Sequence, residues 1–147
     1  MNVVTRSLPT AGRIGLGLVF TVFGLNGFLH FLPQPPAPEA AGNFIGALVA
    51  TGYMLPLIKG VEVVSGLLLL SGRFVPLALT LLAPIIVNIV AFHVVLAPGG
   101  LAIALFVLAV ELYLAWTHRA AFRTVLSARS APEQHAVRGG EPAISRA

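Results

Sequence analysis

The chain has 147 residues, of which 57% are hydrophobic and only 10% are charged. Soluble domains carry about 25% charged residues, so this composition excludes an ordinary water-soluble domain and predicts a protein that lies in a lipid bilayer. The chain has a net charge of +4 and no cysteine, so it can form no disulfide or thiolate metal site of its own.

The first predicted membrane span covers residues 12–32. This stretch is almost wholly apolar, starts beside Arg13 and stops at Pro33, where a run of prolines cannot continue a helix. A cleaved signal peptide is the alternative, because Arg6 and Arg13 precede the apolar core. The run is too long for that, and no convincing small-residue cleavage site follows it. We therefore predict a membrane helix.

Residues 39–52 are apolar at helical spacing but too few to cross a bilayer. They predict a short helix that lies in the membrane interface, or a re-entrant segment.

Three further spans follow in chain order. The second ends at Gly72 and Arg73, as expected beyond a helix C-terminus. The third contains Pro84 and is closed by Pro98, and the fourth follows directly. The predicted limits are residues 53–71, 74–97 and 101–118.

The residues from His118 onward are more polar. His118, Arg119 and Arg123 surround apolar residues in a pattern typical of a basic amphipathic extension that rests on anionic headgroups. Residues 130–147 are polar or small and predict a flexible tail. We expect residues 1–147 to form one membrane domain.

The arginines predict the orientation. All eight fall on one side of the membrane if both termini are cytoplasmic, because cytoplasmic flanks of membrane helices collect Lys and Arg. The sequence thus predicts an all-α, integral membrane four-helix bundle with both termini cytoplasmic and a short interfacial helix between the first two spans. We expect a multi-pass protein of the cytoplasmic membrane whose arginines indicate topology and not nucleic-acid binding.

Several polar side chains lie inside the predicted spans, where each ionisable group costs at least about 2.5 kcal/mol. Counting about 1.5 Å per residue places most of them in the outer half of the membrane. Pairs spaced three or four residues apart share a helix face. The sequence therefore predicts an outer-half polar pocket for a quinone or another small amphipathic substrate. Its candidate residues are Asn26, His30, Lys59, Glu62 and Asn88.

Glu111 and His93 are candidates for a contact with a partner or for a proton site. We expect Glu111 to lie deeper than the pocket and alone, and His93 to lie near the outer surface. An alternative interpretation of all these groups is purely structural, because polar bonds between membrane helices also fix their register.

Other chemistry is less favoured by the sequence. His30 and His93 could in principle ligate haem, but they lack a spacing motif, and no metal-ligand pattern is present. No nucleophile is paired with a base. We therefore predict no catalytic residue, no metal site, and no cofactor beyond a bound quinone.

The first span is rich in glycine. Gly15, Gly17, Gly24 and Gly27 predict close approach of a neighbouring helix, as small residues allow in membrane interfaces.

The second span resembles the hallmark of the DoxX family. Residues 60–73 read GVEVVSGLLLLSGR, in which a glutamate precedes a glycine, a leucine-rich run and a second glycine. Residues 24–31, GLNGFLHF, resemble the subgroup with a histidine near the outer end of the first span. The proline-rich link and the aliphatic third span also fit, so the resemblance covers about residues 12–122.

The resemblance implies a small four-helix protein of bacterial or archaeal cytoplasmic membranes. Some members resemble subunits of thiosulfate:quinone oxidoreductase. Glu62 is carried over as the principal site residue, with Gly66 and Gly72 as packing positions. Many relatives have a lysine where His30 stands, so the resemblance does not transfer an activity.

The leading hypothesis is a non-catalytic subunit of, or accessory to, a membrane redox complex, with a redox protein as partner. A non-enzymatic assembly or scaffold protein is the alternative, and a small-solute transporter is the third hypothesis. The sequence leaves a homo-oligomer open.

Overall fold

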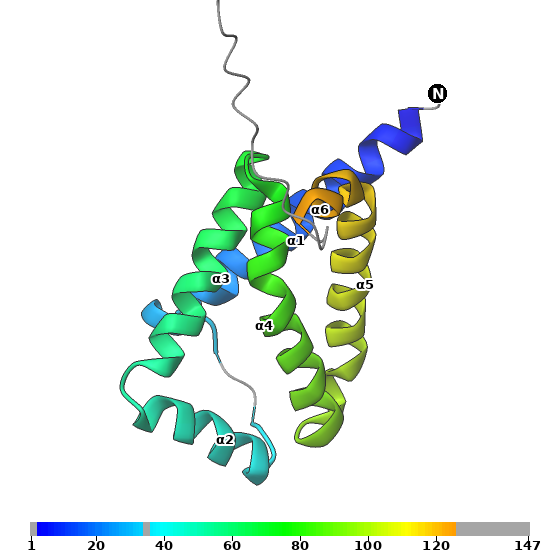
Figure 1. The fold of residues 1–147 in the computed structure, drawn as a ribbon. Helices are drawn as coiled ribbons and strands as arrows, with labels where there is room; N and C mark the ends of the chain where they lie inside the picture. Colours follow the sequence, from blue (N-terminus) through cyan, green and yellow to red (C-terminus); the bar gives the residue numbers. More distant parts are fainter. Residues whose placement is uncertain (1–2, 34–35, 126–147) are drawn as a thin grey trace, which may run out of the picture.

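A computed structural model describes residues 3–33 and 36–125, and within these residues the chain forms helices and no strand (Figure 1). The predicted tail at residues 130–147 lies outside the described residues. In chain order the helices are α1 (Val3–Leu29), α2 (Glu39–Ala50), α3 (Met54–Ser71), α4 (Val75–Val95), the 3-10 helix η1 (Pro98–Gly100), α5 (Leu101–Thr117) and α6 (Arg119–Val125).

Four of the described helical segments are long and apolar enough to cross a membrane. They are Ser7–Leu29, Met54–Ser71, Val75–Val95 and Pro98–Thr117. The prediction of an all-helical chain with four membrane-length helices is confirmed. Apart from α1, the helix limits fall within two residues of the predicted span limits.

Helix α1 differs from the predicted first span at both ends. It begins at Val3 and ends at Leu29, three residues before the predicted limit. His30 leaves the helix in the left-handed conformation, with φ of 51°. The Oδ1 atom of Asn26 then accepts a hydrogen bond of 2.6 Å from the amide of Leu32, which satisfies a donor just beyond the helix. The helix therefore stops before the prolines.

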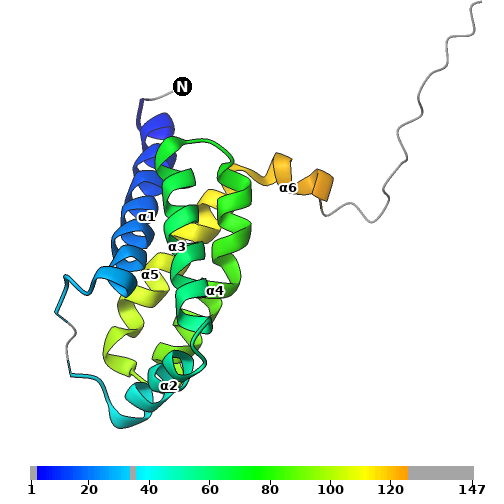
Figure 2. The same cartoon turned by 90° about the vertical axis from the view of Figure 1, so that its left-hand side faces the viewer.

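The four long helices pack in the order α1, α3, α4, α5 around a ring, because α1 and α4 each contact both α3 and α5. Figure 2 shows the N-terminal part of α1, the turn between α3 and α4, and α6 at one end of the bundle. Helix α2 and η1 lie at the other. We call these the α6 end and the α2 end.

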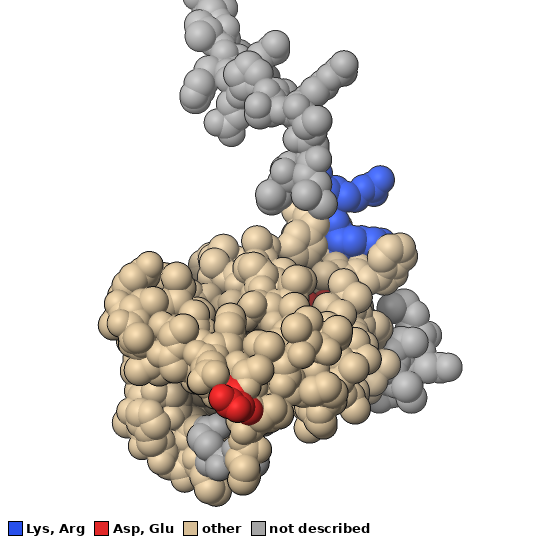
Figure 3. Space-filling model, turned by 90° about the horizontal axis from the view of Figure 1, so that it is seen from below, with Lys and Arg blue, Asp and Glu red and all other residues tan. Residues whose placement is uncertain are grey.

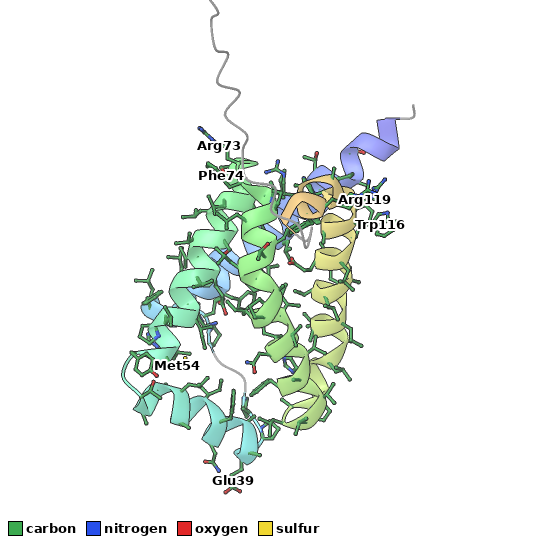
Figure 4. All side chains as sticks on the ribbon, in the orientation of Figure 1. Glu39, Met54, Arg73, Phe74, Trp116 and Arg119 are labelled. Carbon is green, nitrogen blue, oxygen red and sulfur yellow. The ribbon has the colours of Figure 1, made fainter. Side chains whose placement is uncertain are left out.

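Charged side chains differ between the two ends. Arg73 and Arg119 lie at the α6 end, and Glu39 lies at the α2 end (Figure 4). Seen from the α2 end, the described surface is almost wholly uncharged (Figure 3). Arg13 in the N-terminal half of α1, Arg73 between α3 and α4, and Arg119 at the start of α6 thus lie toward the same end.

The backbones of α1 and α3 are in direct contact at Gly66. A Cβ atom added there would lie 2.7 Å from the amide nitrogen of Thr21 and 2.8 Å from the carbonyl oxygen of Gly17. Such distances leave no room for a side chain. Gly66 is therefore a packing position.

Three of the four predicted packing glycines in α1 have this role. Gly17 lies against Leu70 and Gly66, and Gly24 lies against Val63, where an added Cβ would be 2.8 Å from Cγ2. Gly27 lies against the side chain of Lys59. The prediction for Gly15 is wrong, because this glycine faces open space. An added Cβ at Gly15 would have nothing within 4 Å, so this residue makes no close contact with α3.

Gly72 ends α3 and is also a close packing position, because an added Cβ would lie 2.9 Å from Nη1 of Arg13. Its φ of 70° is left-handed, a conformation that glycine adopts without steric cost, and its amide donates to Leu69. The guanidinium of Arg13 donates to the carbonyl oxygens of Leu69 and Leu70. Arg13 thus joins α1 to the C-terminus of α3, where cations are favoured.

The main hydrophobic core lies in the half of the bundle toward the α6 end. It combines residues of α1, α3, α4 and α5 that are almost fully buried. These residues are Leu16, Phe20, Leu69, Val75, Ala78, Leu79, Leu82, Ile86, Val107 and Leu114.

Candidate functional site

A cavity of about 910 Å³ occupies the half of the bundle toward the α2 end. Its walls come from all four long helices, from α2 and η1, and from residues 36–38 of the link between α1 and α2. Most of the lining side chains are apolar. The four polar or charged side chains on its walls are Lys59, Glu62, Asn88 and His93.

Lys59 and Glu62 form an ion pair on the α3 wall. The Nζ atom of Lys59 donates to both carboxylate oxygens, at 3.1 Å to Oε1 and 2.8 Å to Oε2. The three-residue spacing places both side chains on one helix face. Glu62 is only 4% exposed, so the pair keeps its charge balanced within an apolar wall.

The α4 wall carries Asn88 and His93. Asn88 is exposed at the cavity, although it lies within a membrane-length helix. His93 is half-buried, and its Nδ1 atom lies 2.9 Å from the carbonyl oxygen of Ala97. His93 lies in the last turn of α4, toward the α2 end, and it lines the cavity beside η1.

Helix α2 closes the end of the cavity. Its apolar side chains Phe44, Ile45 and Leu48 line the cavity, and Ala41 is fully buried. The Phe44 ring packs against Phe92 of α4 with ring centroids 5.7 Å apart. The predicted short helix is therefore present, and its apolar face is turned to the bundle.

These α2 residues were not among the predicted pocket residues. Their spacing of one, three and four residues marks an apolar helix face, but it cannot distinguish packing on lipid from packing on protein. The short proline-rich link was the one available indication that α2 packs on protein, because a short link keeps α2 close to the end of α1.

Asn26 and His30 do not line the cavity, in contrast to the predicted pocket. Asn26 is 4% exposed and its side-chain oxygen is used by the amide of Leu32. His30 is exposed and lies just beyond the end of α1. Their predicted shared face requires that the helix continue through residue 30. Because the helix ends at Leu29, the Asn26 side chain is buried and the His30 side chain is exposed, and the two do not share a face.

Glu111 lies outside the cavity and is 4% exposed. Within the described residues, its Oε2 atom is buried without a hydrogen-bond partner, as are the hydroxyl oxygens of Thr21 and Ser65. Glu111 is thus buried and without an ion pair in the described part of the chain, as expected. Its burial by this chain favours an internal role over a contact with a partner.

Metal binding and haem binding receive no support from the geometry. Within residues 3–33 and 36–125, no group of three or more His, Cys, Asp or Glu side chains could hold a metal ion. His93 lines the cavity and His30 does not, so the two imidazoles do not face one ligand space.

The chain matches no protein-family model, no curated protein and no solved structure in the three comparisons. Its function is therefore inferred from the cavity and from the sequence pattern.

Proposed function

We propose that this chain is a DoxX-like, multi-pass protein of the cytoplasmic membrane that binds a small amphipathic molecule, such as a quinone. The binding site is the cavity toward the α2 end, and the protein acts as a subunit of, or accessory to, a membrane redox complex. The observation that carries the proposal is a cavity of about 910 Å³ with apolar walls and an ion pair. Ligand sites typically measure about 300–1,000 Å³ and combine apolar walls with few polar groups.

The ion pair supports ligand binding over a purely structural role. Helix register alone can be fixed by polar bonds sealed between helices. Here the Lys59 side chain is 23% exposed and lines the cavity. Because an ammonium group carries three donors and two are used by Glu62, one remains for a ligand oxygen.

The charges at the α6 end support an orientation with both termini cytoplasmic. Arg73, Arg119 and Arg123 are exposed at or near this end, and cytoplasmic flanks favour arginine. The Arg119 guanidinium lies 5.3 Å from the ring centroid of Trp116, a pairing suited to the headgroup region. In this orientation the cavity lies in the outer half of the membrane and α2 is the interfacial helix.

The sequence pattern supports the family and the role of Glu62. The glutamate singled out by the DoxX-like motif is the one whose carboxylate lies at the cavity wall. No residue is assigned to catalysis, so electron transfer belongs to the redox partner. The protein's part is to bind and present the ligand.

Equilibrium binding of decylubiquinone to the full chain in lipid nanodiscs tests the proposal. We expect saturable binding to the wild type and at least about tenfold weaker binding to Glu62→Gln, which disturbs the ion pair and its donors. Glu111→Gln is the matched control, because this second buried carboxyl lies outside the cavity. Absence of saturable binding to the wild type, or an equal loss in both variants, would contradict the proposal.

A further inference from the structure

The imidazole of His93 has a defined hydrogen-bond polarity. Its Nδ1 atom lies 2.9 Å from the carbonyl oxygen of Ala97. A carbonyl oxygen can only accept, so Nδ1 carries the proton and donates. In the neutral ring Nε2 is then an acceptor.

The ring is also held in place on two other sides. Phe92 packs against it edge to face, with ring centroids 5.2 Å apart and an interplanar angle of 84°. Gly100 lies so close that an added Cβ would overlap the ring. These contacts hold the imidazole in a single orientation.

The second ring nitrogen remains available. Nε2 of His93 is not among the buried side-chain atoms without a partner, and within the described residues no hydrogen bond occupies it. His93 lines the cavity, so a bound molecule would lie beside the ring that carries this acceptor.

The cavity walls carry no net charge. Lys59 and Glu62 neutralise each other, and they are the only charged side chains among the described lining residues. A charged ligand would therefore be buried in an apolar cavity without a counter-charge, which is unfavourable. A neutral ligand avoids this cost.

We infer that the cavity binds a neutral lipid-soluble molecule with a hydroxyl group, and that this hydroxyl donates a hydrogen bond to Nε2 of His93. This inference rests on the proposed function, since it narrows the ligand class of the same cavity. Among quinone species, the reduced quinol carries this hydroxyl donor and the oxidised quinone does not. The apolar body of the molecule lies against the aliphatic and aromatic walls. Ethers and esters of the same shape lack the donor, and fatty-acid anions lack both the donor and neutrality.

Competition binding of a matched pair of probes to the full chain in nanodiscs tests the inference. The probes are farnesol and farnesyl methyl ether, which differ by a donor hydroxyl. We expect the wild type to prefer farnesol by about fivefold, as one hydrogen bond of about 1 kcal/mol gives. His93→Phe abolishes the preference. Gly100→Ala retains the imidazole but displaces the ring, so we expect this variant to show a reduced preference for farnesol. His118→Phe replaces a histidine outside the cavity and is expected to retain the preference for farnesol.

The outcomes separate this inference from the proposed function. Equal binding of alcohol and ether by the wild type overturns the inference and leaves the cavity as a ligand site. Retention of the preference by both His93→Phe and Gly100→Ala overturns the assignment to His93. Failure of farnesol, its ether and decylubiquinone alike to bind the wild type overturns the proposed function itself. Thermal unfolding of each variant verifies that it is folded.

Discussion

The same four helices pack closely toward the α6 end and line an open cavity toward the α2 end. In the first half, side chains such as Leu79, Leu82 and Leu114 are buried to 1% exposure or less. In the second half, side chains on the same helices line a space of about 910 Å³. The difference indicates that close packing is concentrated in one half and open volume in the other.

Polar groups follow the same division. In the cavity half, Glu62 has a cation beside it. In the packed half, Glu111 is equally buried, but its Oε2 atom has no hydrogen-bond partner among the described residues. The two halves therefore differ both in their packing and in how buried polar atoms are compensated, and four pairs of variants test this difference.

The largest expected effect distinguishes two isoleucines. Ile86→Ala removes a fully buried side chain from the core and is expected to lower the free energy of unfolding by about 3 to 4 kcal/mol. Ile58→Ala removes a half-buried side chain that already borders the cavity, so the expected loss is below about 1 kcal/mol. Reversible unfolding in mixed detergent micelles measures both. Equal losses would show that the two halves are equally packed.

The next effect concerns the contact between α1 and α3. Gly66→Ala places a methyl group against the backbone of α1, and we expect a loss of about 3 kcal/mol because backbone must move. Gly15→Ala is the control, since an added Cβ there has nothing within 4 Å. The same unfolding measurement applies. A stable Gly66→Ala variant would mean that the two helices are not in backbone contact.

A smaller effect is expected at the ion pair of the cavity half. Lys59→Met leaves the Glu62 carboxylate without its cation, which we expect to cost about 2 kcal/mol. The double variant Lys59→Met with Glu62→Gln removes the unpaired charge and should recover at least half of that loss. If the double variant is no more stable than the single one, the two side chains are not coupled.

The smallest effect is expected at the α6 end. Arg13→Gln shortens the side chain that donates to the carbonyl oxygens of Leu69 and Leu70. We expect a loss of about 1 kcal/mol, the typical contribution of such hydrogen bonds. Arg123→Gln changes an exposed arginine and should leave the free energy of unfolding unchanged. Equal effects would assign the loss to net charge and not to the hydrogen bonds.

Much of the fold could be predicted from the sequence because crossing a bilayer requires a long apolar run. Such runs bounded by Gly72 and Pro98 gave helix limits close to those observed for α3, α4 and α5. The pairing of Lys59 with Glu62 was predictable for a similar reason, since a spacing of three residues on one helix fixes their proximity.

The cavity could not be predicted in the same way. Its membership depends on how helices far apart in sequence are placed, and helical periodicity shows only which residues share a face. Asn26 and His30 illustrate the limit, because a left-handed residue at the end of α1 separates them. Phe44 illustrates the converse, because an apolar residue on α2 joins the cavity by packing on Phe92.

The glycine contact between α1 and α3 also bears on how the protein can change shape. Two helices whose backbones touch cannot approach further, and separating them would open a gap that no side chain fills. Helices α1 and α3 therefore keep a fixed position relative to each other. Any change in the volume of the cavity must therefore come from displacement of α4, α5 or α2, which meet their neighbours through side chains that can change rotamer.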